Sequence, residues 1–358
     1  MDKVKKVLNY IFIDGLSGMA LGLFATLIIG TILDQIASFI PGTVGLWLSY
    51  AALVAKSLTG AGIGAGMAQK YKVSPLVTVS ACVAGMVGAF ASKLIAGAVT
   101  PDSGGMLYTG PGDPLGAFIA AFCAIQIGKL VSGKTKLDIL VTPACSVIVG
   151  SAAGLIAGPP AGIISTKLGE LIMWGTERQP VLMGIIVSVV MGICLTLPIS
   201  SAALGIILGL SGIAGGAAVV GCCCQMIGFA VISYRENKLG GLLAQGLGTS
   251  MLQMPNILKH PQIWIPSIVA SAILGPISTK VLGMTCEAAG AGMGTSGLVG
   301  QFMTFSSMSN AGVDIKIIII EMAVMHFIAP ALICLGISEL MRKKNIIHPG
   351  DMTLESIN

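Results

Sequence analysis

The sequence has 358 residues, of which 54% are hydrophobic and only 10% are charged. Soluble globular proteins carry about 25% charged residues, so this composition excludes a soluble enzyme and predicts an all-α protein that crosses a membrane many times. The net charge of +5 at pH 7 comes largely from the two ends, MDKVKK and MRKK, and does not indicate nucleic-acid binding.

Residues 1–12 are predicted to form an amphipathic helix at the membrane interface. About ten apolar blocks follow, each close to the roughly 20 residues that a spanning helix needs. The basic clusters at both ends place both termini in the cytoplasm, which agrees with an even number of crossings. The blocks cover residues 16–40, 43–68, 73–98, 115–131, 138–163, 180–198, 200–232, 240–258, 262–283 and 313–340.

The ten blocks divide into two sets of five. GMALGLFATLIIGTIL near the start resembles PVLMGIIVSVVMGICL after TERQP, and TGPGDPLGAF has an echo in GTSGLVGQF. Five crossings in each half put the halves in opposite orientations, which is the inverted repeat of many secondary transporters. We therefore predict a first membrane repeat over 13–175, a second over 176–345 and a cytoplasmic tail over 346–358.

The first Gly- and Pro-rich segment is VTPDSGGMLYTGPGDPLGAF, which ends in the fourth block. Its prolines and glycines preclude a continuous helix. It is either an extracellular loop or a re-entrant hairpin that dips into the protein. Asp113 before Pro114 has the position of a helix N-cap. In a re-entrant hairpin, Tyr108, Thr109 and Asp113 are also predicted to hydrogen-bond the hydroxyl groups of a sugar-like solute. A later stretch, AGPPAGI, predicts a helix break near the outer surface.

The second such segment is MTCEAAGAGMGTSGLVGQFMTFSSMSNAG. Glu287 stands alone among small residues, either in a solvated loop or in a second re-entrant hairpin. An ionisable group within a membrane indicates a functional site. The polar residues after it are predicted to bind solute with it: Thr295, Ser296, Gln301 and Asn310, with Ser306 and Ser307 nearby. Glu321 and His326 lie five residues apart in the last block and are not expected to share one helix face.

Two motif matches are set aside. GKLVSGKT fits the P-loop pattern and GMGTSG fits G-x-G-x-x-G, but neither lies in the strand-to-helix context that binds nucleotides. The nine cysteines lie in apolar surroundings, include no C-x-x-C pair and occur with only three histidines. We therefore expect no metal site, no disulfide framework and no cofactor.

The elements GPGDPLGAF and AGPPAGI, the interfacial N-terminus and the length of the chain resemble enzyme IIC, the membrane subunit of bacterial phosphotransferase sugar transport systems. The branch it resembles includes proteins labelled perfringolysin O regulator-like. The resemblance implies a homodimeric carrier in the bacterial plasma membrane that moves a sugar-like solute inward while a separate IIB protein phosphorylates it. It also implies that Glu287 serves the phosphoryl transfer. The family's histidine partner has no counterpart beside Glu287, since His326 falls in the last crossing and His260 in a loop.

Two classes of function follow. The first is a carrier for a small polar solute that works by alternating access, coupled either to phosphorylation or to a Na⁺ or H⁺ gradient. The second is a membrane sensor or regulator that binds a ligand without moving it. Two broken segments in opposite halves favour transport, because a sensor needs only one binding pocket.

Overall fold

The computed structural model describes residues 6–7, 9–98, 108, 110–176 and 178–354. Within these ranges every regular element is a helix, and the one β-type contact is a single bridge between Gly212 and Cys286. The predicted all-α class is therefore confirmed. The chain divides into two compact units, Met1–Ile164 (unit 1) and Ser165–Asn358 (unit 2). This division falls inside a helix and differs from the predicted repeat boundary at 175.

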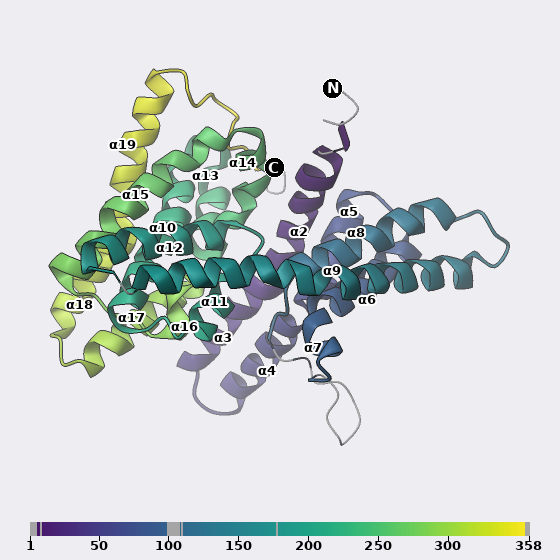
Figure 1. The fold of residues 1–358 in the computed structure, drawn as a ribbon, viewed down its shortest axis with the longest axis horizontal. Coiled ribbons are helices and arrows are strands. Elements are labelled where there is room, and N and C mark those ends of the chain that lie inside the picture. The colour runs from purple at the N-terminus through teal and green to yellow at the C-terminus, as the bar shows by residue number, and fades with distance from the viewer. Residues whose placement is uncertain (1–5, 8, 99–107, 109, 177, 355–358) are drawn as a thin grey trace. The chain divides into compact units, whose positions relative to one another are not determined.

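Unit 1 is a set of packed helices (Figure 1). In chain order, with η for π- or 3₁₀-helices, they are η1 (Asn9–Asp14), α2 (Gly15–Leu23), η2 (Phe24–Ile28), α3 (Ile29–Phe39), α4 (Thr43–Ser57), α5 (Thr59–Lys70), α6 (Pro75–Ala89), α7 (Ala91–Ile95), α8 (Pro114–Val131) and α9 (Asp138–Thr176). Proline begins α6 and α8, as its fixed φ and missing N–H favour. α9 runs through Pro159 and Pro160 into unit 2, so the expected break at AGPPAGI is wrong.

Glycines let the helices of unit 1 approach closely. A Cβ on Gly22 of α2 would clash with the carbonyl of Gly62 on α5. A Cβ on Gly64 of α5 would clash with the carbonyl of Ala81 on α6. Small residues at such crossings allow backbone-to-backbone contact between membrane helices. α5 is therefore packed on one side by α2 and on another by α6.

Unit 2 contains more breaks than unit 1. After the end of α9 its helices are α10 (Pro180–Thr196), α11 (Ser201–Ile207), α12 (Gly212–Ile232), α13 (Tyr234–Leu243), η3 (Ala244–Gly248), η4 (Ser250–Gln253), α14 (Met254–Lys259), η5 (Pro261–Trp264), α15 (Ile265–Pro276), η6 (Ile277–Leu282), α16 (Ala288–Ala291), η7 (Ser296–Leu298), α17 (Val299–Asn310), α18 (Ile315–Met322), η8 (Ala323–Ile328) and α19 (Ala329–Lys343).

α12 lies at the centre of unit 2. It contacts α10, α15, α16, α17 and α19, and almost all of its side chains are buried. A Cβ on Gly221 would clash with the carbonyl of Ser188 on α10. On the side facing α15, the Ser271 hydroxyl donates to the Gly221 carbonyl at 3.3 Å. One glycine thus permits two helix crossings.

Six helices in the described part of the chain are long and apolar enough to cross a membrane, or seven if the pair α4 and α5, bent by 59°, forms one broken span. The six are Asn9–Phe39, Pro114–Val131, Asp138–Pro160, Gly212–Ile232, Pro261–Leu282 and Ile315–Lys343. Two shorter apolar helices, Pro75–Ala89 and Pro180–Thr196, fall below that length. The chain is therefore a multi-pass α-helical membrane protein. The first of these spans begins at Asn9, so the last residues of the predicted interfacial segment are continuous with it.

The predicted crossing at 240–258 is not one helix. Several glycines and Pro255 divide this stretch into the end of α13, η3, η4 and α14. At one end Glu236 pairs with Arg342, and at the other Asn256 donates to the carbonyl of Thr353. Both ends therefore lie at the same end of unit 2, beside the C-terminal residues, and the apolar pattern here marks a broken connection between helices.

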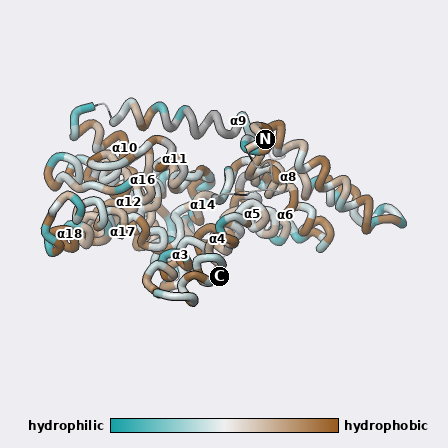
Figure 2. The backbone as a smooth tube through the Cα atoms, turned by 90° about the horizontal axis from the view of Figure 1, so that it is seen from below, coloured by the Kyte–Doolittle hydropathy of each residue, from teal (hydrophilic) through white to brown (hydrophobic). Residues whose placement is uncertain are grey.

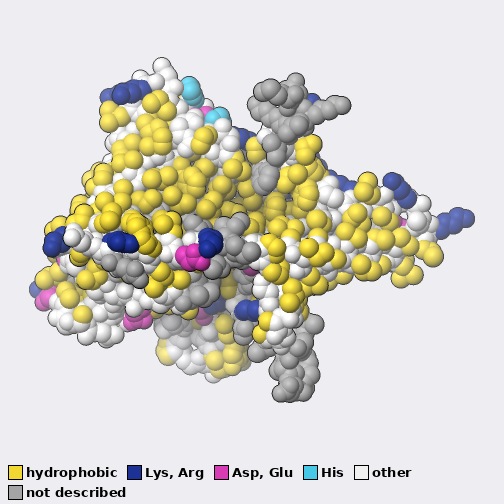
Figure 3. Space-filling model, viewed as in Figure 1, with side chains coloured by type: hydrophobic (Ala, Val, Ile, Leu, Met, Phe, Trp, Pro, Cys, Tyr) yellow, Lys and Arg dark blue, Asp and Glu magenta, His cyan; other side chains and the backbone are white. Residues whose placement is uncertain are grey.

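Apolar side chains cover much of the surface. Figure 3 shows hydrophobic side chains over much of the face it draws, with Lys and Arg in a few separate places. Figure 2 shows hydrophobic residues along α8 and hydrophilic residues in the turn that follows it. On α4 the side chains of Val44, Trp47 and Tyr50 are 55–66% exposed. A surface of this kind suits lipid or an apolar partner and not water.

Candidate functional site

Asp113 caps α8, as predicted. Its two carboxylate oxygens accept hydrogen bonds from the backbone N–H groups of Leu115 (3.2 Å) and Gly116 (3.1 Å). Its own N–H donates to the carbonyl of Ala89 at 2.7 Å, which anchors the segment to the end of α6. The carboxylate is half-buried, and capping accounts for the hydrogen bonds that its two oxygens make in the structure.

Of the two other predicted residues of this segment, only Tyr108 is among the residues that the structure describes. Tyr108 is half-buried, and its ring lies against that of Phe90 with the centroids 4.8 Å apart. Thr109 lies outside the described residues. This segment belongs to unit 1, whereas the predicted site residues from Glu287 onward belong to unit 2.

Two non-helical stretches meet inside unit 2. Residues 208–211 separate α11 from α12, and residues 283–287 separate η6 from α16. The N–H of Cys286 donates to the carbonyl of Gly212 at 3.1 Å. A Cβ on Gly216 would clash with the carbonyl of Met284. Cys286 and Met284 are fully buried, so this irregular backbone lies in the interior of the unit.

The backbone after α16 takes the left-handed conformation three times in five residues. The φ angles are +54° at Gly294, +54° at Gly297 and +59° at Leu298. Glycine adopts this region freely, whereas a branched residue such as Leu298 is strained there. Gly294 also lies against the backbone of Cys222, where a Cβ would come within 2.9 Å of the Cys222 carbonyl carbon. The segment is thus held in a costly conformation against α12, as is common at functional sites.

Glu287 lies on the edge of this segment with hydroxyl groups around it. Its Oε1 accepts a hydrogen bond of 2.7 Å from the Ser306 hydroxyl of α17. The neighbouring Ser307 hydroxyl donates to Thr285 Oγ1 at 2.8 Å. All four side chains are half-buried. We refer to Glu287, Thr285, Ser306 and Ser307 as the Glu287 group. Asn310 is exposed one turn beyond Ser306 and extends the same side of α17.

Gln301 belongs to a second, deeper group. Its Nε2 lies 3.1 Å from Nδ1 of His326 on η8 and donates to Cys223 Sγ of α12 at 3.5 Å. Gln301 is 8% exposed and His326 is fully buried. Gln301 Oε1 and His326 Nε2 have no hydrogen-bond partner in the structure. Gln301 and Ser306 are five residues apart on an α-helix, so they point about 140° apart, and the Glu287 group and the Gln301 pair occupy different sides of α17.

Thr295 and Ser296 are buried between these groups and η3. The Thr295 hydroxyl donates to the carbonyl of Gly246 at 2.5 Å. Ser296 is 2% exposed, and its hydroxyl has no hydrogen-bond partner in the structure. Thr295 therefore ties the strained segment to η3, and Ser296 is not accessible to solute in the described conformation.

The sequence signals for some of these contacts were weak or absent. His326 and Glu321 precede or lie in a π-helix, η8, and such a helix alters the rotation between residues five apart. The periodicity of an ordinary α-helix therefore does not predict which side of this segment His326 lies on. Gly246 contributes only a backbone carbonyl, for which no sequence signal exists. The role of Cys223 as a contact of Gln301 was likewise not foreseen.

A separate polar cluster closes one end of unit 1. The Lys129 ammonium group donates to the Tyr10 hydroxyl at 2.8 Å and lies 4.9 Å from the centre of the Tyr71 ring. The Tyr71 hydroxyl donates to the carbonyl of Tyr10 at 2.7 Å. Burial, with a smaller contribution from the nearby Tyr10 and Asp14, raises the pKa of Tyr71 well above its usual range. Tyr71 is therefore a neutral donor that fastens the first helix to the end of α5.

These features define a polytopic α-helical membrane protein with irregular backbone in the interior of one unit. The family profile described as phosphotransferase system, EIIC, matches residues 13–354, and the chain belongs to this family. A comparison with curated proteins found no match. Family membership implies a membrane sugar-permease subunit that handles a solute and usually works with a separate IIB protein.

Proposed function

We propose that the chain is a carrier for a small polar, sugar-like solute and that it works by alternating access. The observation that carries this proposal is the Glu287 group, a half-buried carboxylate with hydroxyl groups beside two paired non-helical stretches. Irregular backbone in a membrane protein is tolerated where protein covers it or where it lines a cavity. Discontinuous helices of this kind form the solute sites of many carriers.

The chemistry of the Glu287 group suits a solute with several hydroxyl groups. The ionised carboxylate only accepts hydrogen bonds, whereas each neighbouring hydroxyl both donates and accepts. Glu287 binds a solute hydroxyl in place of Ser306, and Asn310 contributes from the exposed end of the same side. Thr295, Ser296 and Gln301 support the irregular backbone of unit 2 from its buried side. Tyr108 and Asp113 support the Gly- and Pro-rich segment of unit 1.

Phosphorylation by a separate IIB protein gives Glu287 a second role. The solute oxygen forms a bond to the phosphorus atom of the phosphorylated IIB group while the bond from phosphorus to IIB breaks. Glu287 accepts the proton that leaves the solute hydroxyl, as a general base. His326 lies buried behind Gln301 and takes no direct part in this step.

We also infer that both termini face the cytoplasm. In unit 1 the turns after α5 and α8 lie together, since the hydroxyls of Ser74 and Ser132 are 3.2 Å apart. These turns carry lysines, and Lys129 contacts Tyr10 near the N-terminus. In unit 2 Arg342 donates to the carbonyl of Ile232, so Arg235 and the basic C-terminal end of α19 share one end of the unit. Both basic ends fit the positive-inside rule. The homodimer and the bacterial plasma membrane are parts of the same proposal.

The test is uptake of radiolabelled hexoses, hexitols and N-acetylhexosamines by vesicles that contain the chain, with and without a phosphorylated IIB protein. For a solute that is taken up, Glu287→Gln should lower uptake at least tenfold, because charge-assisted hydrogen bonds contribute about 1.5–3 kcal/mol each. The matched control is Glu339→Gln, which alters an exposed carboxylate paired with Arg235 and should leave uptake unchanged.

The other outcomes separate the competing functions. Uptake that needs no IIB protein but collapses with the Na⁺ or H⁺ gradient would identify an ion-coupled carrier. Saturable binding without uptake would identify a sensor, in agreement with the perfringolysin O regulator-like branch. Equal loss of uptake in both variants would contradict the assigned role of Glu287.

A further inference from the structure

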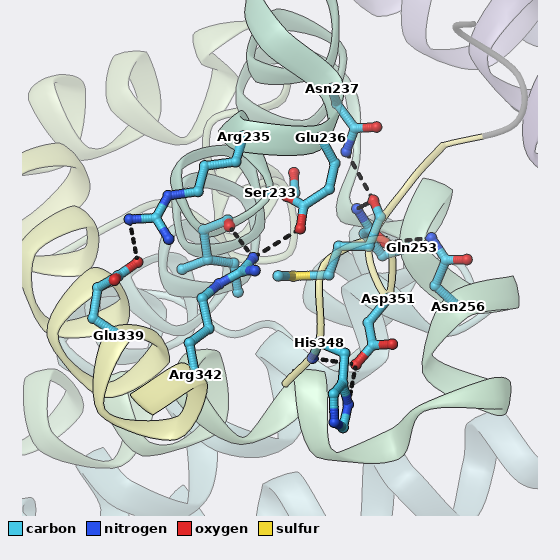
Figure 4. Close-up of polar contacts among 12 residues, drawn as sticks. Ser233, Arg235, Glu236, Asn237, Gln253, Asn256, Glu339, Arg342, His348 and Asp351 are labelled. Atoms are coloured by element: carbon cyan, nitrogen blue, oxygen red, sulfur yellow. Dashed lines mark hydrogen bonds and ion pairs between the residues drawn. The ribbon is translucent and has the colours of Figure 1, made fainter. Parts of the chain in front are cut away.

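The C-terminal residues 346–354 are docked onto unit 2 and do not trail from it. Ile347, Met352 and Leu354 are each at most 2% exposed. The segment is bonded to α13, η4 and α14 through Asn237, Gln253 and Asn256 (Figure 4). A short segment at a chain terminus is ordinarily poorly ordered unless it is tied down. We refer to residues 346–354 as the C-terminal strap.

Side-chain amides hold the backbone of the strap. Asn237 donates to the carbonyl of Met352 at 2.8 Å and accepts from the N–H of Leu354 at 2.8 Å. Gln253 donates to the same Met352 carbonyl at 3.0 Å. Asn256 donates to the carbonyl of Thr353 at 2.9 Å. Asn237 thus pairs with the strap as a neighbouring β-strand would, through one donor and one acceptor.

The strap ends in a turn held by Asp351. The Asp351 carboxylate accepts from the N–H of His348 at 2.8 Å, and its other oxygen lies 3.6 Å from Nδ1 of His260, the residue that follows α14. Asp351 is 7% exposed. These contacts place Met352 so that its side chain enters the core and its carbonyl faces the amides.

The side-chain amides of Gln253 and Gln245 connect the strap to η3 through hydrogen bonds. Gln253 Nε2 uses its second hydrogen to donate to Gln245 Oε1 at 2.9 Å. Gln245 Nε2 in turn donates to the Ser233 hydroxyl and to the Gly241 carbonyl, each at 2.9 Å. An amide nitrogen has two hydrogens, so both Gln253 and Gln245 use every donor they have. Removing the strap leaves a buried donor of Gln253 without a partner.

η3 then connects to the strained segment beside Glu287. Gln245 is followed by Gly246, whose carbonyl accepts the 2.5 Å hydrogen bond from Thr295. Thr295 directly follows Gly294, the first of the three left-handed positions. A strained backbone also occurs in α13 beside the strap, because Lys238, next to Asn237, has φ +50° and ψ −151°. Strained conformations persist only where surrounding contacts hold them.

We propose that the C-terminal strap is a releasable latch that fixes η3 and, through Gly246 and Thr295, the strained segment at residues 294–298. When the strap is docked, the segment is held. When the strap leaves, Gln253 loses its hydrogen bond to Met352, the bonds between Gln253, Gln245 and η3 rearrange, and residues 294–298 become free to move. The consequence for transport rests on the proposed carrier function, whereas the coupling itself rests only on the contacts of unit 2.

Hydrogen exchange on the full-length protein in lipid nanodiscs tests the coupling without any solute. Asn256→Ala removes the bonds to Thr353 and Gln253, and strap amides should exchange about tenfold faster because each bond contributes about 1 kcal/mol net. Amides at 244–248 and 294–298 should accelerate with them. The control is Gln262→Ala on η5, an amide with no hydrogen bond to the strap in the structure, which should leave all three regions unchanged.

Met352→Ser removes a buried apolar side chain of the strap, weakens its docking from the strap side and carries the test if Asn256→Ala does not fold. It should accelerate the same three regions. Faster exchange of the strap alone, with 244–248 and 294–298 unchanged, would overturn the latch, as would an unchanged strap in both variants. Since the readout needs no uptake, a failed latch leaves the Glu287 experiment intact, and a failed carrier assay leaves this one intact.

Discussion

Arg342 and Glu236 form a buried ion pair that joins α19 to α13, and its removal should be costly. Arg342 Nη2 lies 2.9 Å from Glu236 Oε1 and 3.2 Å from the carbonyl of Ile232. Their side chains are only 10% and 8% exposed. Replacing one partner leaves the other charge buried and unpaired, which costs about 3–5 kcal/mol. Replacing both by apolar residues of similar size should cost much less.

The expected change in melting temperature follows from the size of unit 2. For Ser165–Asn358, an unfolding entropy of about 2 cal/mol/K per residue gives about 0.4 kcal/mol/K for the unit, so the single variants should melt about 7–12 °C lower. The assay is a thiol-reactive dye that becomes fluorescent on reaction. It suits this chain because six cysteines are buried: Cys194, Cys222, Cys223, Cys224, Cys286 and Cys334.

A double-mutant cycle distinguishes pairing from packing. Arg342→Met and Glu236→Leu should each lower the melting temperature by the amount above, and the double variant should recover most of it. High salt should not reproduce the loss, because a buried pair is screened little. Single variants that melt like the parent protein would refute the reasoning, as would a double variant that melts as low as the worse single one.

Three other substitutions have clear expected outcomes. Gly221→Ala should abolish or severely lower the yield of folded protein, because the new Cβ meets the backbone of α10. Its control, Gly336→Ala on α19, meets nothing within 4 Å and should raise stability by up to about 1 kcal/mol. Equal effects of the two variants in the dye assay would contradict this. Ser296→Ala removes a buried hydroxyl that has no hydrogen-bond partner in the structure, so the melting temperature of the variant should stay level or rise. A clear fall in melting temperature would show that the hydroxyl is paired. Tyr71→Phe should lower the free energy of unfolding by about 1 kcal/mol, because it removes the hydrogen bond to Tyr10. This loss should be the same at every pH between 6 and 9, because the raised pKa keeps Tyr71 neutral there. A loss of stability that varies over this range would contradict the neutral donor.

One local signal in the sequence predicted a helix start correctly. Asp113 followed by Pro114 predicted a cap, and the carboxylate accepts from the two N–H groups that this role requires. The all-α membrane class and the EIIC family followed from composition and from a few Gly/Pro motifs. These features depend on residues close together in the chain, which is why they can be recognised there.

Contacts between distant residues were not predictable in the same way. The apolar stretch at 240–258 has membrane-like composition, yet Gln253 and Asn256 hold it at one end of unit 2 through bonds to the C-terminal strap, and Gln253 also donates to Gln245 within the stretch. Several of its apolar residues, Leu252, Met254 and Ile257 among them, are buried by protein, and hydropathy does not distinguish such residues from those that face lipid. His326 was not assigned to the site because it falls in the last crossing, whereas the structure places it beside Gln301 of α17, 25 positions away in the chain.

The cysteine triplet shows why this chain is rich in small residues. Cys222, Cys223 and Cys224 are fully buried on three successive sides of α12. The Cys222 thiol points to the Met191 and Ala291 carbonyls, Cys223 accepts from Gln301, and the Cys224 carbonyl accepts from the Cys334 thiol. Each cysteine therefore meets a different part of the unit: α10 and α16, α17, and α19. A larger residue at any of the three would separate α12 from a neighbour, and a helix surrounded on every side needs side chains that are small, apolar and tolerant of nearby carbonyl groups. The same requirement explains Gly221 immediately before the triplet, so the composition of α12 reflects its central position in unit 2.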